Sequence, residues 1–283
     1  MERKSIVVGT MFRETELLDD LEKNSKLHPL ELAKQAGFRV VVLDCEHKAF
    51  NEERIANYAK VAHGIGVSLW LRPRQQEEEV ISKYADIGVT GFMIPNAIDL
   101  PRVQKVINQA FFDPIADPRA HIRRGYSIGE LLLDLQDLGN KIGKEIEYVN
   151  RNTVVVVQTE HPKGIDRLAK ILAIKGITGT IIGPNDLAIN LSRLKGNEPL
   201  LELEVNRMYE QEVMLQAYER IGKIAVDSEK VAGIHFTSRD QAGLIKRLIE
   251  DKRFHNYRLI LFGTERNLLE EKDYTAGLVE EFK

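Results

Sequence analysis

The sequence contains a single cysteine, Cys45, among its 283 residues, and it lacks any long apolar run. One cysteine excludes an internal disulfide and fits a reducing compartment. The apolar runs fall short of the roughly 20 residues that a membrane helix needs, and the first ten residues do not resemble a signal peptide. We therefore expect a cytoplasmic protein that does not enter a membrane.

A strong charge bias is also absent. The chain has 40 Lys and Arg residues against 43 Asp and Glu residues, a net charge of −3, and both signs are scattered along it. Without a basic stripe to follow a phosphate backbone, nucleic acid is not an expected partner. We found no internal repeat, low-complexity tract or interdomain linker, so the sequence predicts one domain over residues 1–283.

Short apolar runs alternate with longer helical patterns. Runs without polar alternation are typical of parallel strands that are buried on both faces. The eight runs are 6–8 (ending near Met11), 40–43, 67–71, 91–94, 153–157, 178–182, 232–236 and 258–262. The clearest helical patterns are 29–36, 51–63, 77–87, 100–110, 164–174, 202–228 and 241–250.

Eight such units predict an α/β fold, a closed (β/α)8 TIM barrel, because strict alternation gives parallel strands with right-handed crossovers. The pattern breaks at residues 111–152, where we expect an irregular insertion with a helix near 128–138. The last helical segment begins at Thr264 and extends to about residue 282.

Polar residues follow several of the predicted strands. In such barrels the carboxyl ends of the strands form one face, and this face carries the chemistry. The polar residues there are Asp44, Glu46 and His47 after the second strand, Arg72 after the third, Gln158 and Glu160 after the fifth, Gly183 to Asp186 after the sixth, His235 near the seventh and Glu265 after the eighth.

Glu160 and Asp186 are candidate metal ligands. Gln158 and Glu160 are two residues apart and share one face of their strand, while Asp186 belongs to the neighbouring strand end. An all-oxygen site of this kind suits Mg²⁺ or Mn²⁺. A 2-oxo acid could chelate the metal, which would stabilise the enolate that forms when the adjacent carbon–carbon bond breaks.

Arg72 and His47 complete the candidate chemistry. Arg72 can place a planar cation against carboxylate or enolate oxygens. His47 is a proton carrier near neutral pH, and either Asp44 or Glu46 could fix its tautomer.

Each of these residues has a simpler interpretation, which the residue spacing leaves open. Glu160 and Asp186 could form surface salt bridges at the barrel rim. His47 and His235 could be structural histidines, and Arg72 could be solvated before the turn at Pro73. Cys45 is expected to be a packing residue, and Glu265 could simply favour the first turn of a helix.

The chain resembles the HpcH/HpaI family, the class II, metal-dependent pyruvate aldolases also called 2,4-dihydroxyhept-2-ene-1,7-dioate aldolases. The resemblance covers residues 29–269 except 111–152. It is carried by four landmarks, each at the end of its own predicted strand. They are Asp44-x-Glu46-His47, Arg72, Gln158-x-Glu160 and Gly183-Pro184-x-Asp186-Leu187.

The resemblance implies a barrel of the phosphoenolpyruvate/pyruvate type and a function for each landmark. Glu160 and Asp186 would hold Mg²⁺, Mn²⁺ or Co²⁺, and Arg72 would bind pyruvate and its enolate. His47, paired with Asp44, would help a metal-bound water to act as acid and base. The remaining implied substrate-binding residues are Gln158, Gly183, Pro184 and Asn185. The backbone N–H groups near Asn185 would hold the pyruvate carboxylate at a helix N-terminus.

The same resemblance implies a homo-oligomer, because many members are hexamers that exchange their last helix, here 264–282. The chain departs from the family after the fourth strand, where Pro95 to Asp99 replaces a Val-Glu-Thr-like sequence, and at Lys48 to Phe50. An arginine-alanine segment of the family is not evident, although Arg123 to Tyr126 could be its remnant. The pyruvate half of the site therefore matches the family, whereas the half that contacts the aldehyde differs.

Three functions remain open from the sequence. The first is a divalent-metal-dependent aldolase, a carbon–carbon lyase that acts on a pyruvate-like 2-oxo acid and an aldehyde. The second is a related oxaloacetate decarboxylase or citrate-lyase-like enzyme acting on acyl-CoA conjugates. The third is a barrel subunit without catalytic activity, against which the converging carboxylates Glu160 and Asp186 argue.

Overall fold

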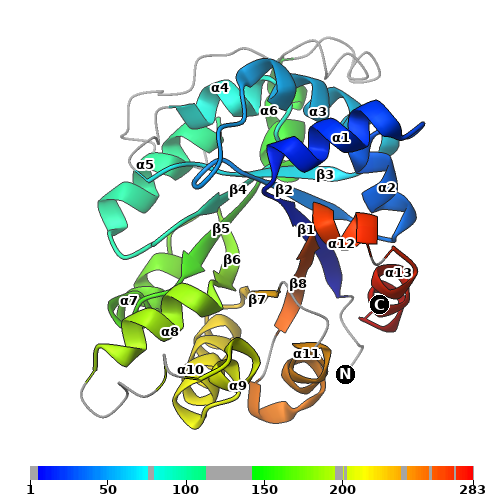
Figure 1. Ribbon diagram of the computed structural model, residues 1–283. Helices are drawn as coiled ribbons and strands as arrows, with labels where there is room; N and C mark the ends of the chain where they lie inside the picture. Colours follow the sequence, from blue (N-terminus) through cyan, green and yellow to red (C-terminus); the bar gives the residue numbers. More distant parts are fainter. Residues whose placement is uncertain are drawn as a thin grey trace.

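A closed barrel of eight parallel strands forms the centre of the protein (Figure 1). The computed structural model describes residues 6–75, 80–112, 142–194, 200, 203–236, 241–254, 257–270 and 272–282. The strands are β1 Val7–Phe12, β2 Val40–Asp44, β3 Ser68–Arg72, β4 Gly91–Ile94, β5 Val154–Thr159, β6 Ile177–Ile182, β7 Val231–Phe236 and β8 Tyr257–Thr264. Each strand pairs with the next along the chain, and β8 pairs with β1. The predicted TIM barrel is thus confirmed.

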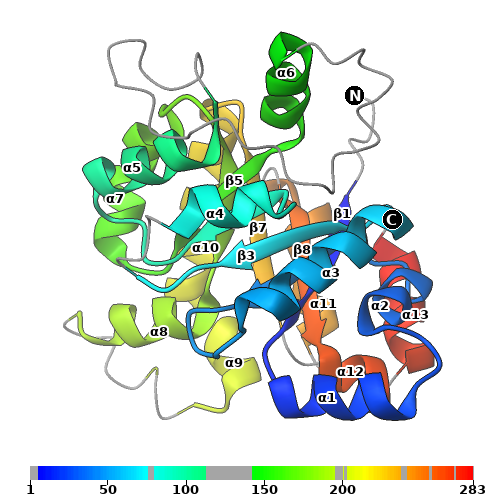
Figure 2. The same ribbon diagram turned by 90° about the horizontal axis from the view of Figure 1, so that it is seen from above.

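Helices surround the barrel and cover the outer face of its strands (Figures 1 and 2). They are α1 Thr15–Asn24, α2 Pro29–Gln35, α3 Glu52–Ile65, α4 Ile81–Asp86, α5 Leu100–Ala110, α6 Ile142–Asn152, α7 Pro162–Leu172, α8 Pro184–Ser192, α9 Val205–Tyr209, α10 Glu212–Asp227, α11 Ala242–Glu250, α12 Glu265–Glu270 and α13 Lys272–Phe282. Within the described ranges, no helix has the length and apolar character required to span a membrane.

Strand residues alternate between two apolar cores. Side chains such as Leu43 and Val155 point outward and pack with the helices. Side chains such as Val42, Trp70 and Val156 point inward and fill the barrel. Because both faces are buried, the strands consist of continuous apolar residues, and polar side chains are concentrated where the strands end.

The region 111–152 differs in part from the predicted irregular insertion. After α5 ends at Ala110, the structure places a regular helix, α6, directly before β5. The predicted helix near 128–138 and the Arg123 to Tyr126 segment lie outside the described residues. Figure 2 shows α6 at the edge of the barrel, and of its residues only Val149 is buried.

Other helix boundaries also differ from the prediction. The sequence pattern did not predict α1, because only Leu18 and Leu21 are buried among its many charged residues. The long helix expected at 202–228 is divided into α9 and α10, because Gln211 adopts an extended backbone conformation. Two helices, α12 and α13, occupy the last segment, and α12 packs against α1, α2, β1 and β8 of the same chain. Exchange of this segment between subunits remains a prediction.

The indole ring of Trp70 fills the barrel interior next to Gly91 on the neighbouring strand. The ring nitrogen donates a hydrogen bond of 2.9 Å to the Ser68 hydroxyl, which fixes the orientation of the ring. A Cβ atom on Gly91 would lie 2.2 to 2.5 Å from three atoms of the indole. Only glycine therefore leaves room for Trp70 at this position.

We predict that Gly91→Ala lowers the free energy of unfolding by about 2 kcal/mol, because the added methyl group overlaps the Trp70 ring. Gly64→Ala is the matched control, since a Cβ there meets no atom within 4 Å and lies in α3. That control should raise stability by about 1 kcal/mol. Urea denaturation measures both changes, and a Gly91→Ala protein as stable as wild type would contradict the packing described here.

Candidate active site

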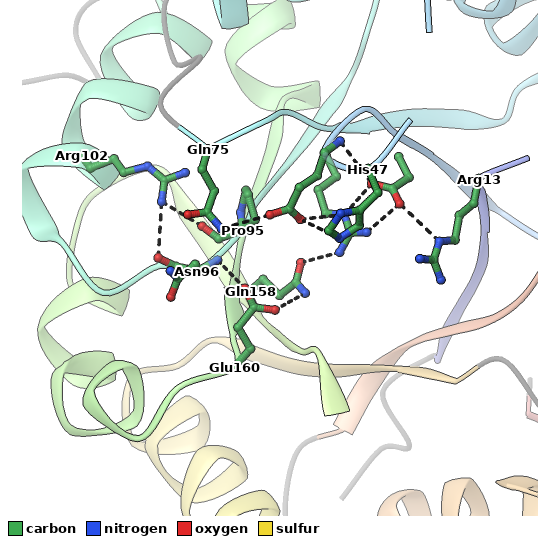
Figure 3. Close-up of polar contacts among 11 residues, drawn as sticks. Arg13, His47, Gln75, Pro95, Asn96, Arg102, Gln158 and Glu160 are labelled. Atoms are coloured by element: carbon green, nitrogen blue, oxygen red, sulfur yellow. Dashed lines mark hydrogen bonds and ion pairs between the residues drawn. The ribbon is translucent and has the colours of Figure 1, made fainter. Parts of the chain in front are cut away.

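Polar side chains from several strands converge at the carboxyl end of the barrel (Figure 3). They surround a small pocket of about 60 Å³. Its lining residues are Arg13, His47, Arg72, Gln158, Gly183, Pro184, Asn185, Asp186, Tyr209 and His235. The pocket thus brings together most of the residues that the sequence analysis selected.

A buried ion pair between Asp44 and Arg72 lies at the base of the site. The ends of β2 and β3 place these two residues in register, side by side. Nε and Nη2 of Arg72 donate hydrogen bonds to the two Asp44 oxygens at 2.9 and 2.7 Å. Such a two-point contact fixes the plane of the guanidinium group.

The pair determines the charge state of both groups. Burial alone would raise the pKa of the Asp44 carboxyl, but the hydrogen bonds and charge of Arg72 outweigh it, so the pKa lies below its ordinary value. For Arg72, burial would lower the pKa, and the contacts with Asp44 raise it above its ordinary value. Both side chains are therefore charged at neutral pH.

Gln158 connects Arg72 to Glu160. Nη1 of Arg72 donates to Oε1 of Gln158 at 3.3 Å, and Nε2 of Gln158 donates to Oε2 of Glu160 at 2.5 Å. The amide oxygen thus faces the cation and the amide nitrogen faces the carboxylate (Figure 3). Gln158 lies in β5 and Glu160 directly follows the strand, and their side chains lie on the same side of the chain, as their spacing predicts.

The Glu160 carboxylate is buried and lies near other acids. Burial, followed by the charges of Asp186 and Glu46, raises the pKa of Glu160 to about 7. The backbone N–H of Asn96 opposes this shift by donating to Oε1 of Glu160 at 2.8 Å. Asn96 has a positive φ of 45°, a conformation uncommon for residues other than glycine.

Gly183 allows β6 to approach this group closely. A Cβ at Gly183 would lie 2.5 Å from Nε2 of Gln158 and 2.7 Å from Oε2 of Glu160. Any larger residue would therefore displace both side chains. This requirement gives Gly183 a structural function in the site, in addition to its place at the turn into α8.

The N-terminus of α8 faces the pocket through Asn185 and Asp186, which are both exposed. Gly183 precedes the helix and provides no side-chain cap for its first turn. Free backbone N–H groups at a helix N-terminus favour the binding of an anion. The Tyr209 hydroxyl donates to Oδ1 of Asn185, and burial raises the pKa of Tyr209 to about 12, so it remains an O–H donor.

His47 lies at the mouth of the pocket, and its side chain is 51% exposed. Its nearest carboxylate is Glu46, with 3.7 Å between Nε2 of His47 and Oε2 of Glu46. The Asp44 carboxylate that the resemblance implied as its partner instead binds Arg72, with Arg13 as a second cation nearby. Glu46 is therefore the acid in position to orient His47.

Two carboxylates, Glu160 and Asp186, are the oxygen groups that the sequence predicts as metal ligands. Their mutual repulsion is one cause of the raised pKa of Glu160, and a bound cation would remove it. In the part of the chain that the structure describes, no group of three or more His, Cys, Asp or Glu side chains forms a cage for a metal. A cation here would hence need further oxygens from substrate or water, as is usual for Mg²⁺.

Arg13, Tyr209 and the backbone of Asn96 also belong to the site, although the sequence did not predict them. Arg13 directly follows β1. The search for polar residues after each predicted strand would have found it if the first predicted strand had extended to Phe12. His235, for which a structural function was the simpler interpretation, lines the pocket. Tyr209 comes from α9, where no sequence signal marks it, and Asn96 contributes only its backbone.

Comparison with known proteins finds a matching family model, curated relatives and solved structures of similar fold. Residues 25–228 match the family model described as HpcH/HpaI aldolase/citrate lyase. The 5-keto-4-deoxy-D-glucarate aldolase of Klebsiella pneumoniae is 26% identical over 167 residues, which are 58% of this chain and 60% of that protein. The chain thus spans less than two thirds of the length of this relative.

Two solved structures share the fold. The crystal structure of an HpcH/HpaI aldolase from Desulfitobacterium hafniense DCB-2 aligns with a TM-score of 0.73 at 23% identity, covering 99% of this chain and 93% of that one. The protein CitE from Mycobacterium tuberculosis, in complex with magnesium and acetoacetate, aligns with a TM-score of 0.56 at 13% identity, covering 100% and 92%.

We predict that Asp44→Asn lowers the free energy of unfolding by about 3 kcal/mol, because the Arg72 cation then lacks its buried partner. Adding Arg72→Met should recover part of this loss, since the double variant removes both charges of the Asp44–Arg72 pair. Urea denaturation of the single and double variants measures the coupling. Equal midpoints for Asp44→Asn and wild type would contradict the importance of the pair.

Proposed function

The chain belongs to the HpcH/HpaI aldolase/citrate lyase family, and we propose that it is a divalent-metal-dependent aldolase. Its reaction would join a pyruvate-like 2-oxo acid to an aldehyde, or separate them. One observation carries this proposal: Asp186 and the fixed Arg72 cation line one pocket, and the charge of Asp186 acts on the buried Glu160 carboxylate, which accepts a hydrogen bond from the lining residue Gln158. The aldolase name of its curated relatives supports the same reaction class.

The residues present fit a divalent cation. Glu160 is buried between acidic neighbours that raise its pKa, so its charged form gains most from a cation. Carboxylate oxygens suit Mg²⁺, Mn²⁺ or Co²⁺, and Glu160 and Asp186 would hold the ion. When bound, the ion would supply Lewis-acid stabilisation of the negative charge that develops on the 2-oxo acid.

The chain's own groups would bind the 2-oxo acid from two sides. Backbone N–H groups at the start of α8 would receive its carboxylate, an arrangement favoured at helix N-termini. Arg72 would donate to its oxygens through Nη1, because Nε and Nη2 already bind Asp44. Gln158 would keep Nη1 directed towards this position.

The proton transfers define the reaction. In the synthetic direction, the methyl carbon of pyruvate loses a proton, its electron pair forms the bond to the aldehyde carbon, and the aldehyde oxygen gains a proton. Cleavage is the reverse. His47, which is accessible at the mouth of the pocket and lies near Glu46, would exchange these protons. Arg72 would stabilise the enolate by providing a donor that is already oriented.

The first test follows the exchange of pyruvate methyl protons with deuterium by NMR, which requires no knowledge of the aldehyde. We predict exchange with Mg²⁺, Mn²⁺ or Co²⁺ that is lost with chelator. Arg72→Lys should reduce the rate by about 100-fold, because a lysine cannot contact Asp44 and the enolate together.

Arg54→Lys is the matched control for this experiment. Arg54 also binds carboxylates, those of Asp19 and Glu22, but it lies on α3 and does not line the pocket. This variant should exchange pyruvate protons at the wild-type rate. If wild type shows no exchange with any of the metals, the aldolase proposal is wrong for pyruvate, and larger 2-oxo acids would be tested in the same assay.

A second prediction concerns the metal directly. Glu160→Gln should weaken Mn²⁺ binding by about 100-fold or more, since the substitution removes a charged ligand rather than an outer-shell partner. Titration of Mn²⁺ followed by electron paramagnetic resonance measures this without any turnover. Glu147→Gln, a substitution of an exposed glutamate on α6, is the control. Equal Mn²⁺ affinity in Glu160→Gln and wild type would remove Glu160 from the metal site.

A further inference from the structure

A second pocket lies at the amino ends of β3, β4 and β5, between helices α3, α4 and α6. Its volume is about 290 Å³, against about 60 Å³ for the active-site pocket, and the two share no lining residue. Figure 2 shows α6 at the end of the barrel opposite to α8 and α12, which follow the carboxyl ends of their strands. This pocket is therefore separate from the candidate active site.

The floor of this second pocket is apolar and consists of small side chains. Near the end of α3, a Cβ atom on Gly66 would meet no atom within 4 Å, so the space beside it is open. Protein interiors are normally filled by side chains, and an uncovered apolar hollow favours an apolar occupant. The buried residues that form the floor are Ala59, Ala62, Ala85, Val89 and Val149.

Helix α6 closes one side of the second pocket without filling it. Val149 is buried there, whereas the neighbouring ring of Tyr148 lines the pocket and is 39% exposed. A surface helix ordinarily buries its apolar face against the elements below it. The Tyr148 ring thus offers a large, flat apolar surface to a molecule that enters the pocket.

The second pocket carries little charge. Among the described residues that line it there is no Asp, Glu, Lys or Arg, and His63 is its single basic residue. The Ser68 and Thr90 hydroxyls lie 2.9 Å apart, and the Thr90 hydroxyl donates to the Leu69 carbonyl at 3.1 Å. The Thr153 hydroxyl donates to a backbone carbonyl of α6 at 2.8 Å. Because these groups bind each other, an ion that entered the pocket would lose water without gaining a partner of opposite charge.

The polar groups at the edge of the second pocket favour a hydrogen-bond donor. Helices α3, α4 and α6 all end here, and the C-terminus of a helix exposes carbonyl groups that carry partial negative charge. The Asn152 amide nitrogen donates to the Tyr148 carbonyl at 2.8 Å, which leaves the amide oxygen as an acceptor. An anion is therefore disfavoured, and a neutral molecule with an O–H or N–H group is favoured.

Trp70 connects the second pocket to the barrel interior. Its ring nitrogen donates to the hydroxyl of Ser68, which lines the pocket, and Trp70 is the only tryptophan in the sequence. Its fluorescence should therefore report what happens at this hydroxyl. Ser68 and Arg72 lie at opposite ends of β3, roughly 13 Å apart at about 3.3 Å per residue. A small ligand beside Ser68 hence does not reach the active site.

We propose that this second pocket is a ligand site, and that its ligand is a neutral aromatic molecule with a hydrogen-bond donor. The ring occupies the apolar floor and packs against Tyr148, and the donor binds the acceptors where the helices end. An apolar cavity of about 150 Å³ holds benzene. The larger volume here thus admits a ring with a substituent. The inference goes beyond the proposed aldolase function and does not depend on it.

Benzyl alcohol is the probe, because it combines one ring with a neutral hydroxyl. It is titrated into the full-length protein, and Trp70 fluorescence, excited where benzyl alcohol does not absorb, follows binding. Ligand-observed NMR measures the same equilibrium independently. We expect saturation with a Kd on the order of 1 mM. Benzoate, the same ring with a charged carboxylate, should bind at least about 10-fold more weakly.

Two variants locate the probe. Ala62→Leu places an isobutyl group where the ring would lie and should weaken binding by about 10-fold or more. Tyr148→Ala removes an exposed ring and should weaken binding by about 5-fold. Ala56→Leu on α3 and Ile142→Ala on α6 are the matched controls, because neither position lines the pocket. Both controls should bind benzyl alcohol as wild type does.

Several results would overturn the second site. Absence of binding in both fluorescence and NMR would refute it, and wild-type affinity in both Ala62→Leu and Tyr148→Ala would place the probe elsewhere. Equal affinity for benzoate would refute the ligand class. Asp186→Asn, a substitution at the active-site pocket, should leave the Kd unchanged. Loss of binding in that variant would assign the probe to the active site instead.

Discussion

The bidentate ion pair between Asp44 and Arg72 is the interaction on which the rest of the site depends. From it a continuous row of polar contacts crosses the mouth of the barrel. Arg13 contacts Asp44 at one end, and Gln158 connects Arg72 to Glu160 at the other (Figure 3). Each group has its orientation set by its neighbour, so the carboxylate and guanidinium groups are positioned before any substrate arrives.

This arrangement concentrates uncompensated negative charge at one place. Asp44 is satisfied by two arginines, whereas Glu160 has only an amide, a backbone N–H and the more distant charge of Arg72 against burial and two nearby acids. The raised pKa of Glu160 follows from that imbalance. The buried Glu160 carboxylate is therefore locally unfavourable, and the proposed cation would offset this cost.

The sequence predicted the barrel and most of the strand-end residues because buried parallel strands have a distinctive apolar pattern. The same pattern could not predict which residues become partners. Asp44 contacts Arg72, while His47 lies nearest Glu46, because the register of β2 with β3 decides this and no local signal encodes it. Tyr209 reaches the site from the short helix α9, where periodicity carries no information about the direction of a side chain.

The most direct test of the account is a crystal structure with Mn²⁺ and oxalate, a planar dianion that resembles the enolate of pyruvate. The account predicts anomalous density for Mn²⁺ between Glu160 and Asp186, with oxalate bound to it and contacting Arg72 through Nη1. The two Asp44 contacts of Arg72 should persist unchanged. Mn²⁺ bound elsewhere, or oxalate held without Arg72, would contradict the central claim that this row of charges forms an enolate-stabilising site.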